Sequence, residues 1–250
     1  MLSLLRPTQA MFGEAAGIVT ARFGAAVALS MRTNTDPLFN RVLGFGDGDL
    51  PLLDDVLGWY AQRQTACRFD IVSGASSQRA GDALAGRGFK PRPLETFLHA
   101  SPKPGVSFGQ GGPKVRRLAA EKMDEFAAVF LEVYPQEPPV EASVRACLKA
   151  QYGQPEWHCY LASVAGAVAA FGAMYVSDGV ASLISAATLP RFRRQGCQTA
   201  LLARRIADAA KLGCDLVWSH AARGSTSQCS MERQGMRPDF IKHRWKRSTT

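Results

Sequence analysis

The chain has 250 residues, of which 46% are hydrophobic and 20% charged, and its 30 basic and 21 acidic residues give a formal net charge of +9. This length suggests one large domain or two modest ones, and the apolar fraction excludes a chain that is disordered by composition. After residue 113 there are 19 basic and 12 acidic residues, an excess that suits a polyanionic ligand and would also suit nucleic acid.

The first hundred residues predict a small domain of mixed strands and helices. Charged side chains at Arg6, Glu14 and Arg22 interrupt the apolar start of the chain, so we expect no signal peptide. Apolar runs between turn residues predict strands at 25–31, 38–45, 69–72 and 93–100, and helical spacing predicts helices at 50–64 and 77–86.

Residues 101–113 are rich in Gly and Pro and predict a linker, after which a second set of elements follows. We expect strands at 115–118, 158–164, 168–176, 180–189, 216–220 and 240–246, and helices at 121–134 and 141–152. The charge-free run 157–177 has almost the length of a membrane span, but Ala165 and Gly166 divide it into a hairpin, so we reject a span. The basic run 242–247 is interpreted as a last edge strand with a basic outer face rather than a nucleic-acid arm.

The most informative stretch is 189–213, LPRFRRQGCQTALLARRIADAAKLG. Pro190 ends the preceding strand, and a helix opens after Gly196 on a basic turn. The first N–H groups of a helix lack partners and lie at the positive end of its dipole, so this turn predicts a phosphate or pyrophosphate site. A buried stripe is formed by Leu202, Ile206 and Ala209. In the C-terminal half of the helix, where the helix dipole favours cations, lie Arg204, Arg205 and Lys211.

This turn resembles the signature of the GNAT superfamily of acyl-CoA-dependent N-acetyltransferases, Arg/Gln-x-x-Gly-x-Gly/Ala. Here the signature reads Arg-Arg-Gln-Gly-Cys-Gln over 193–198, with Gln198 in place of the usual small residue. A Gln amide could itself hydrogen-bond a phosphate. The segment 225–236, STSQCSMERQGM, is similar to the family's closing helix and turn, Glu-Arg-x-Gly-Phe. The resemblance covers residues 114–247 and implies an α+β fold with a mixed sheet.

The first half reads as a degenerate copy of the same fold. Ala-Gly-Arg-Gly-Phe at 85–89 echoes Glu-Arg-Gln-Gly-Met at 232–236, each before a final strand. The copy's equivalent phosphate loop, 44–49, carries two carboxylates, each of which would repel a pyrophosphate by roughly 1 kcal/mol. We therefore expect a degenerate GNAT-like domain at 1–100, a linker at 101–113, and a GNAT domain at 114–250 that alone binds the co-substrate.

The resemblance implies acetyl-CoA as co-substrate, held by backbone groups of the family's fourth strand and of the turn after it. The candidate binding residues are Ala187, Thr188, Leu189, Arg193, Arg194, Gln195, Gly196, Cys197, Gln198 and Thr199. Thr188 could equally be an ordinary strand residue. We expect no metal, because the six cysteines show no CxxC pair and no Cys/His cluster at zinc spacing, and such thiols suit a cytoplasmic protein.

Many relatives use a Tyr of the closing helix as general acid, and Met231 occupies that position here. The candidates for proton transfer are instead His220, Ser225 and Ser230. Glu132, Tyr134 and Glu137 could form a pocket for a cationic amine or could simply be a solvated helix face.

The resemblance predicts transfer of an acetyl group to a primary amine of a small molecule or peptide. Three alternatives stay open: an acyltransferase with a longer acyl donor, a CoA-binding module without catalysis, and a basic protein associated with nucleic acid. We expect neither a nucleic-acid nor a membrane partner, and a homodimer is open.

Overall fold

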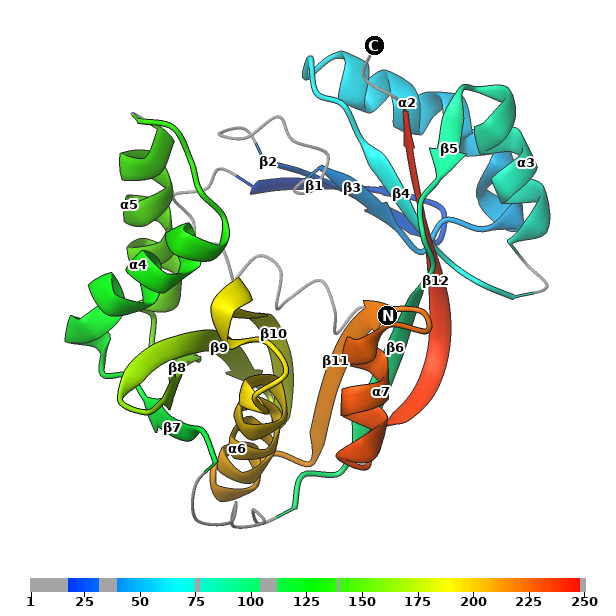
Figure 1. Ribbon diagram of the computed structural model, residues 1–250. Helices are drawn as coiled ribbons and strands as arrows, with labels where there is room; N and C mark the ends of the chain where they lie inside the picture. The colour runs from blue at the N-terminus through cyan, green and yellow to red at the C-terminus, as the bar shows by residue number, and fades with distance from the viewer. Residues whose placement is uncertain (1–17, 32–39, 75–76, 104–111, 139, 248–250) are drawn as a thin grey trace. The chain divides into compact units, whose positions relative to one another are not determined.

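The computed structural model describes residues 18–31, 40–74, 77–103, 112–138 and 140–247. The chain divides into two compact units (Figure 1). Unit 1 comprises residues 1–97, 221–223 and 239–250, and unit 2 comprises residues 98–220 and 224–238.

Unit 1 is built on the strand order β1-β2-β3-β4-β12-β6, with β5 also paired to β12. The strands are β1 (Ile18–Phe23), β2 (Ala26–Met31), β3 (Arg41–Leu43), β4 (Arg68–Val72), β5 (Phe89–Pro91), β6 (Glu95–Ala100) and β12 (Arg237–Arg247). β3 and β4 are parallel, whereas β1–β2, β2–β3 and β4–β12 are antiparallel. The helices are η3 (Asp47–Leu52), α2 (Leu53–Ala61) and α3 (Gln78–Gly86).

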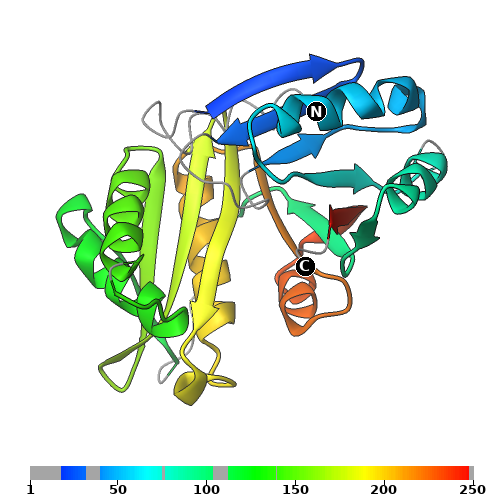
Figure 2. The same ribbon diagram turned by 90° about the horizontal axis from the view of Figure 1, so that it is seen from above.

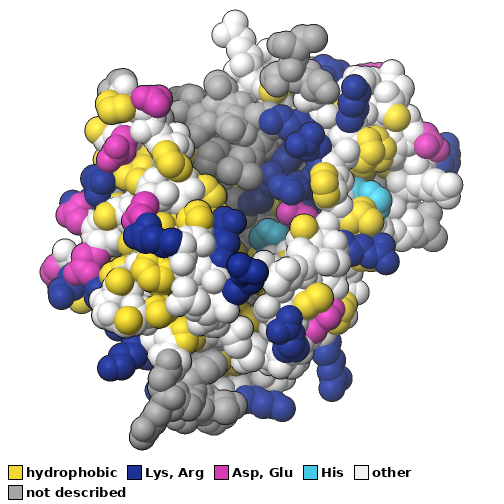
Figure 3. Space-filling view, in the orientation of Figure 1, with side chains coloured by type: hydrophobic (Ala, Val, Ile, Leu, Met, Phe, Trp, Pro, Cys, Tyr) yellow, Lys and Arg dark blue, Asp and Glu magenta, His cyan; other side chains and the backbone are white. Residues whose placement is uncertain are grey.

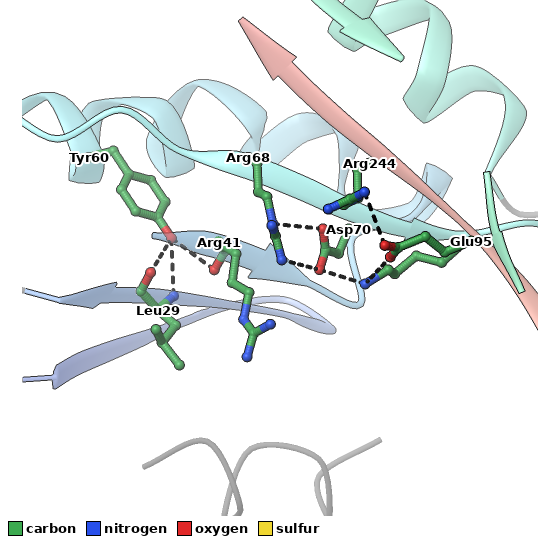
Figure 4. Close-up of polar contacts among 8 residues, drawn as sticks. Leu29, Arg41, Tyr60, Arg68, Asp70, Glu95 and Arg244 are labelled. Atoms are coloured by element: carbon green, nitrogen blue, oxygen red, sulfur yellow. Dashed lines mark hydrogen bonds and ion pairs between the residues drawn. The ribbon is translucent and has the colours of Figure 1, made fainter. Parts of the chain in front are cut away.

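The core of unit 1 packs α2 and α3 against these strands. Phe69 makes edge-to-face contacts with Phe45 and Phe89, at ring-centroid distances of 5.2 and 5.3 Å. The buried Tyr60 hydroxyl accepts a hydrogen bond from the Leu29 N–H at 3.1 Å and lies within 2.9 Å of the carbonyls of Leu29 and Arg41 (Figure 4). This hydroxyl therefore ties α2 to β2 and β3.

A buried network of charges joins β4, β6 and β12 in unit 1 (Figure 4). Asp70 pairs with Arg68 at 3.1 Å and with Lys242 at 3.0 Å, and Glu95 pairs with Lys242 at 3.3 Å and with Arg244 at 3.0 Å. Burial raises the pKa of Asp70, but the attraction of Lys242 and Arg68 outweighs it and leaves that pKa below its usual value.

Unit 2 has the strand order β11-β10-β9-β8-β7. Its strands are β7 (Lys114–Arg117), β8 (Trp157–Val164), β9 (Ala167–Ser177), β10 (Val180–Thr188) and β11 (Leu216–Ala222), of which only β10 and β11 are parallel to each other. Its helices are η4 (Ala120–Lys122), α4 (Met123–Val133), α5 (Val140–Tyr152), η5 (Pro190–Phe192), α6 (Cys197–Lys211) and α7 (Thr226–Arg233).

Successive side chains of a strand point to opposite faces of its sheet, and in unit 2 helices pack against both faces. Tyr160 and Ala170 belong to the core that contains Leu201 of α6. The neighbouring Phe171 contacts Phe126 of α4 at a centroid distance of 5.2 Å. α4 and α5 lie together along one side of the strands (Figure 2). The hairpin β8–β9 is thus the buried centre of unit 2.

No helix of the described residues is long and apolar enough to cross a membrane.

Most predicted elements are confirmed, with several differences. β1 and β5 were not predicted, and the helix expected at 50–64 is divided into η3, which contains Pro51, and α2. Residues 38–39 of an expected strand and residues 104–111 of the expected linker lie outside the described residues.

The C-terminal strand differs most from its prediction. It is not an edge strand, because β12 pairs with both β4 and β5, and its Lys242 and Arg244 form ion pairs inside unit 1. Residues 239–250 accordingly belong to unit 1 and not to the unit that holds residues 114–220. A strand's sequence shows that it will pair but not which strand it will join.

A glycine stands in the turn before β5 and again in the turn before β12. Gly88 follows α3 with φ +80°, and Gly235 follows α7 with φ +84°. This left-handed conformation is easy only for glycine, so each turn requires that residue.

Candidate functional site

The strands β10 and β11 of unit 2 part after a short parallel stretch. Their pairing joins residues 180–182 to residues 216–218, and among the described residues no ladder between them continues beyond it. The Ser219 hydroxyl donates to the Leu183 carbonyl at 2.7 Å just where the strands part. The edge of β10 from Leu183 to Thr188 is thereby left outside the ladder with β11.

A β-bulge lies in this same part of β10. The register with β9 shifts between Ile184 and Ala187, so Ser185 and Ala186 have no partner in the described register. Ser185 has φ +50°, a conformation that is strained for a non-glycine residue. The Tyr152 hydroxyl at the end of α5 donates to the Ser185 hydroxyl at 2.7 Å, and burial raises the pKa of Tyr152 to about 12.

The basic turn follows β10 directly. Arg193 and Arg194 are exposed, and Gly196, with φ +80°, is the N-cap residue of α6. A glycine offers no side-chain cap, so the first N–H groups of this 15-residue helix stay available to a ligand. Figure 3 shows Lys and Arg side chains spread over the visible face of the molecule.

Several of the predicted binding residues have local partners. Gln198 donates from its side-chain amide to the Thr188 hydroxyl at 3.0 Å, which links α6 to the end of β10. The Cys197 side chain is buried in the core of unit 2, and burial raises the pKa of its thiol. These side chains stabilise the turn, whose residues 193–196 are exposed.

In unit 1, the carboxylates of the loop at 44–49 accept hydrogen bonds from backbone N–H groups of the same unit. Asp49 accepts from the N–H groups of Gly46 and Ala25, at 3.0 and 2.9 Å. Asp47 accepts from the N–H of Ala80 at the start of α3, at 2.8 Å. Of these three N–H groups, only that of Gly46 belongs to the loop itself.

The residues predicted for proton transfer lie on β11 and α7. His220 is half-buried, and its imidazole stacks on Trp218 at a centroid distance of 6.3 Å. Ser225 is the N-cap of α7 and accepts from the Gln228 N–H at 3.2 Å, and Ser230 donates to the Thr226 carbonyl at 2.8 Å. Both hydroxyls therefore stabilise α7. Met231 packs against the core of unit 2.

The three residues considered for an acceptor pocket lie at the end of α4 and just after it. Glu132 forms an exposed ion pair with Arg191 of η5. Tyr134 is 47% exposed and lies beside Phe130 at a centroid distance of 5.0 Å, and Glu137 is exposed. All three residues are exposed, as on a solvated helix face. Among the described residues, no group of three or more His, Cys, Asp or Glu could hold a metal ion.

Sequence reasoning missed Ser185, Tyr152 and Ser219, and it treated Arg205 only as a cation favoured by the helix dipole. Arg205 is in fact buried, with 3% of its surface exposed. Small residues such as Ser185 and its neighbours form no local pattern that indicates a bulge. The hydrogen-bond partners of Ser185 could therefore not be predicted from the sequence.

Comparison with known proteins identifies the class of protein to which this site belongs. Residues 120–235 match the sequence model of the Acetyltransferase (GNAT) family and form a domain of that family. A search of curated proteins found no match.

Solved structures extend the likeness to both units. The chain is similar to a GCN5-related N-acetyltransferase from Kribbella flavida, with 17% identity and a TM-score of 0.71, covering 93% of this chain and 90% of that one. A GCN5-related N-acetyltransferase from Sphaerobacter thermophilus has 16% identity and a TM-score of 0.64, covering 89% and 80%. A tandem GNAT protein from the clavulanic acid biosynthesis pathway has 12% identity and a TM-score of 0.62, covering 90% and 79%. At these identities the likeness establishes the fold alone, while the family supports acyl-CoA N-acyltransferase activity.

Proposed function

We propose that this chain is an N-acetyltransferase that uses acetyl-CoA to acetylate a primary amine of a small molecule or peptide. The observation that carries the proposal is that β10 parts from β11 beside a bulge and then leads directly into the Gly196 turn of α6. One unit thus offers both an open strand edge for the thioester and a helix start for the pyrophosphate.

Acetyl-CoA fits this arrangement through the backbone. The N–H groups from about Arg194 to Thr199 bind the pyrophosphate, helped by the helix dipole and by the exposed guanidinium groups of Arg193 and Arg194. The pantetheine runs along Ala187, Thr188 and Leu189 at the free edge of β10. The family match at 120–235 supports this assignment.

The reaction needs a neutral amine, a stabilised oxyanion and a proton for the leaving thiolate. An alkyl amine has a pKa of about 10, so a base must take its proton before its nitrogen attacks the thioester carbonyl. The C–S bond then breaks, and the thiolate of CoA receives a proton. We assign the relay of the amine's proton to His220, since Ser225 and Ser230 already use their hydroxyl groups within α7.

We further propose that unit 1 holds no CoA. In its loop at 44–49 the Gly46 N–H already donates to Asp49, and Asp47 is held by the Ala80 N–H of α3, so a pyrophosphate there would meet two carboxylates. The partner of the chain besides CoA is then the amine acceptor. The excess positive charge of the chain attracts the phosphates of CoA rather than nucleic acid.

Release of free thiol from acetyl-CoA, measured with a panel of primary amines, tests this function. We expect thiol release that depends on the amine and is lost in Gly196→Glu. A second candidate, a CoA-binding module without catalysis, is favoured by Met231 at the position of the usual Tyr. Tight CoA binding without thiol release for any amine would support that module and contradict the proposed function.

A further inference from the structure

Arg205 is a buried cation in the middle of α6. It is 3% exposed, and no carboxylate of the described residues forms an ion pair with it. Burial lowers the pKa of its guanidinium to about 10, so the group stays protonated at neutral pH. A charge held inside a core without a counter-charge is costly, so its hydrogen-bond partners matter.

Those partners are backbone carbonyls at the edge of the β10 bulge. Nη1 donates to the Ala173 carbonyl at 2.9 Å and approaches the Ile184 carbonyl at 3.4 Å. Nε donates to the Leu201 carbonyl at 3.1 Å. Ala173 and Ile184 are register partners on β9 and β10, and Ile184 is the last residue before the register shifts.

Gly172, which has no side chain, leaves space for the guanidinium of Arg205. A Cβ placed on Gly172 would lie 3.3 Å from Cζ of Arg205, closer than ordinary packing allows. The bulge is therefore held from both faces of the sheet, by Arg205 of α6 at Ile184 and by Tyr152 of α5 at Ser185.

The carbonyl of Ile184 and the N–H of Ser185 belong to the same peptide group. A donor on the carbonyl draws electron density away from the nitrogen, so the N–H becomes a stronger donor. Ser185 has no partner in the described β9 register. In the proposed function, the backbone of this part of β10 faces the thioester.

We propose that Arg205 is a positioning residue for acetyl transfer: its charge, applied through the Ile184–Ser185 peptide, strengthens the backbone donor that stabilises the thioester oxyanion. This inference rests on the proposed function and adds to it a buried residue that touches neither co-substrate nor acceptor. A purely structural Arg205 would hold the bulge in shape without changing the polarity of that peptide.

The experiment combines kinetics with the infrared spectrum of bound acetyl-CoA labelled with ¹³C at the thioester carbonyl. Arg205→Gln keeps a donor but removes the charge, and Arg205→Lys keeps the charge. Arg204→Gln is the matched control, because Arg204 is the preceding residue and its side chain instead pairs with Asp208 at 2.9 Å.

We expect the carbonyl stretch of bound acetyl-CoA to lie below its value in water for the wild type, Arg204→Gln and Arg205→Lys. In Arg205→Gln it should move toward the free value while kcat falls by at least about tenfold, as for a weakened oxyanion donor. The affinity for CoA should change little, because the pyrophosphate site is at the other end of the β10 edge. Should Arg205→Gln fail to fold, Gly172→Ala displaces the guanidinium and is expected to shift the same band.

An identical carbonyl stretch in the wild type and Arg205→Gln, or an unshifted stretch in the bound wild type, would overturn the role of Arg205. Absence of acetyl-CoA binding by the wild type would instead contradict the proposed function, so the two failures are distinguishable.

Discussion

At the scale of single residues, the site contains strained backbone conformations that need contacts from neighbouring side chains to persist. Ser185 and Arg194 both have positive φ, at +50° and +63°, on either side of the junction between β10 and α6. Strain of this kind persists only where neighbouring groups hold it, and here Tyr152 holds the first.

The bond between Tyr152 and Ser185 is expected to stabilise unit 2 modestly. Tyr152→Phe removes one hydrogen bond and should lower the free energy of unfolding by about 1 kcal/mol. Ser185→Ala should cost a similar amount, because it removes the same bond. Denaturant unfolding of both variants and the double variant checks this, since a shared bond makes the two costs less than additive. Fully additive costs would show that the two hydroxyls do not act together.

His220 is the residue on which proton transfer is expected to depend. His220→Ala should lower kcat by at least about 100-fold, with the KM for acetyl-CoA little changed, because a general acid or base contributes about that much. Ser230→Ala is the comparison, since its hydroxyl is engaged by the Thr226 carbonyl. Steady-state kinetics with one amine measures both. Nearly full turnover in His220→Ala would make His220 structural and pass the role to Ser230.

At the scale of elements, the charged network that joins β4, β6 and β12 is expected to stabilise unit 1. Asp70→Asn leaves Arg68 and Lys242 without their shared carboxylate and should cost about 3–5 kcal/mol, as for a buried pair that loses one partner. Asp54→Asn is the control, because its pair with Arg87 is exposed and contributes little. Equal stability of the two variants in denaturant would contradict the role of the network.

The same carboxylate predicts how stability depends on pH. The pKa of Asp70 is lower in the folded than in the unfolded state, so its contribution is present above the unfolded value of about 3.9 and is lost as pH falls through the folded value. Thermal unfolding followed from pH 6 downward should therefore show a steeper acid loss in the wild type than in Asp70→Asn.

How far the sequence predicts these elements depends on whether the signal is local. The hairpin β8–β9, the turn at Gly196 and the helix α6 follow from apolar periodicity and from Gly and Pro, all of which are local. The pairing of β12 with β4 and the bulge at Ser185 depend on contacts between distant segments, which no local pattern encodes. Arg205 was predicted at the correct place on the helix, but its burial was not.

At the scale of the whole molecule, the loop at 44–49 of unit 1 and the Gly196 turn of unit 2 differ in what their backbone groups face. In unit 2 the turn ends in a glycine N-cap with exposed arginines, whereas in unit 1 the aspartates of the loop accept hydrogen bonds from backbone N–H groups. The basic C-terminal run also has a structural use, because Lys242 and Arg244 pair with carboxylates inside unit 1. The charge excess therefore does not by itself indicate nucleic acid.

The central claim is that one acetyl-CoA binds per chain, at the start of α6. Calorimetric titration of acetyl-CoA into the wild type, Gly196→Glu and Gly213→Glu tests it most directly. Gly213 follows the other end of α6 with φ +73°, so the control carries the same strain and the same added charge away from the proposed site. We predict one site per chain in the wild type and in Gly213→Glu, and no binding in Gly196→Glu. A stoichiometry of two, or unchanged affinity in Gly196→Glu, would contradict the account.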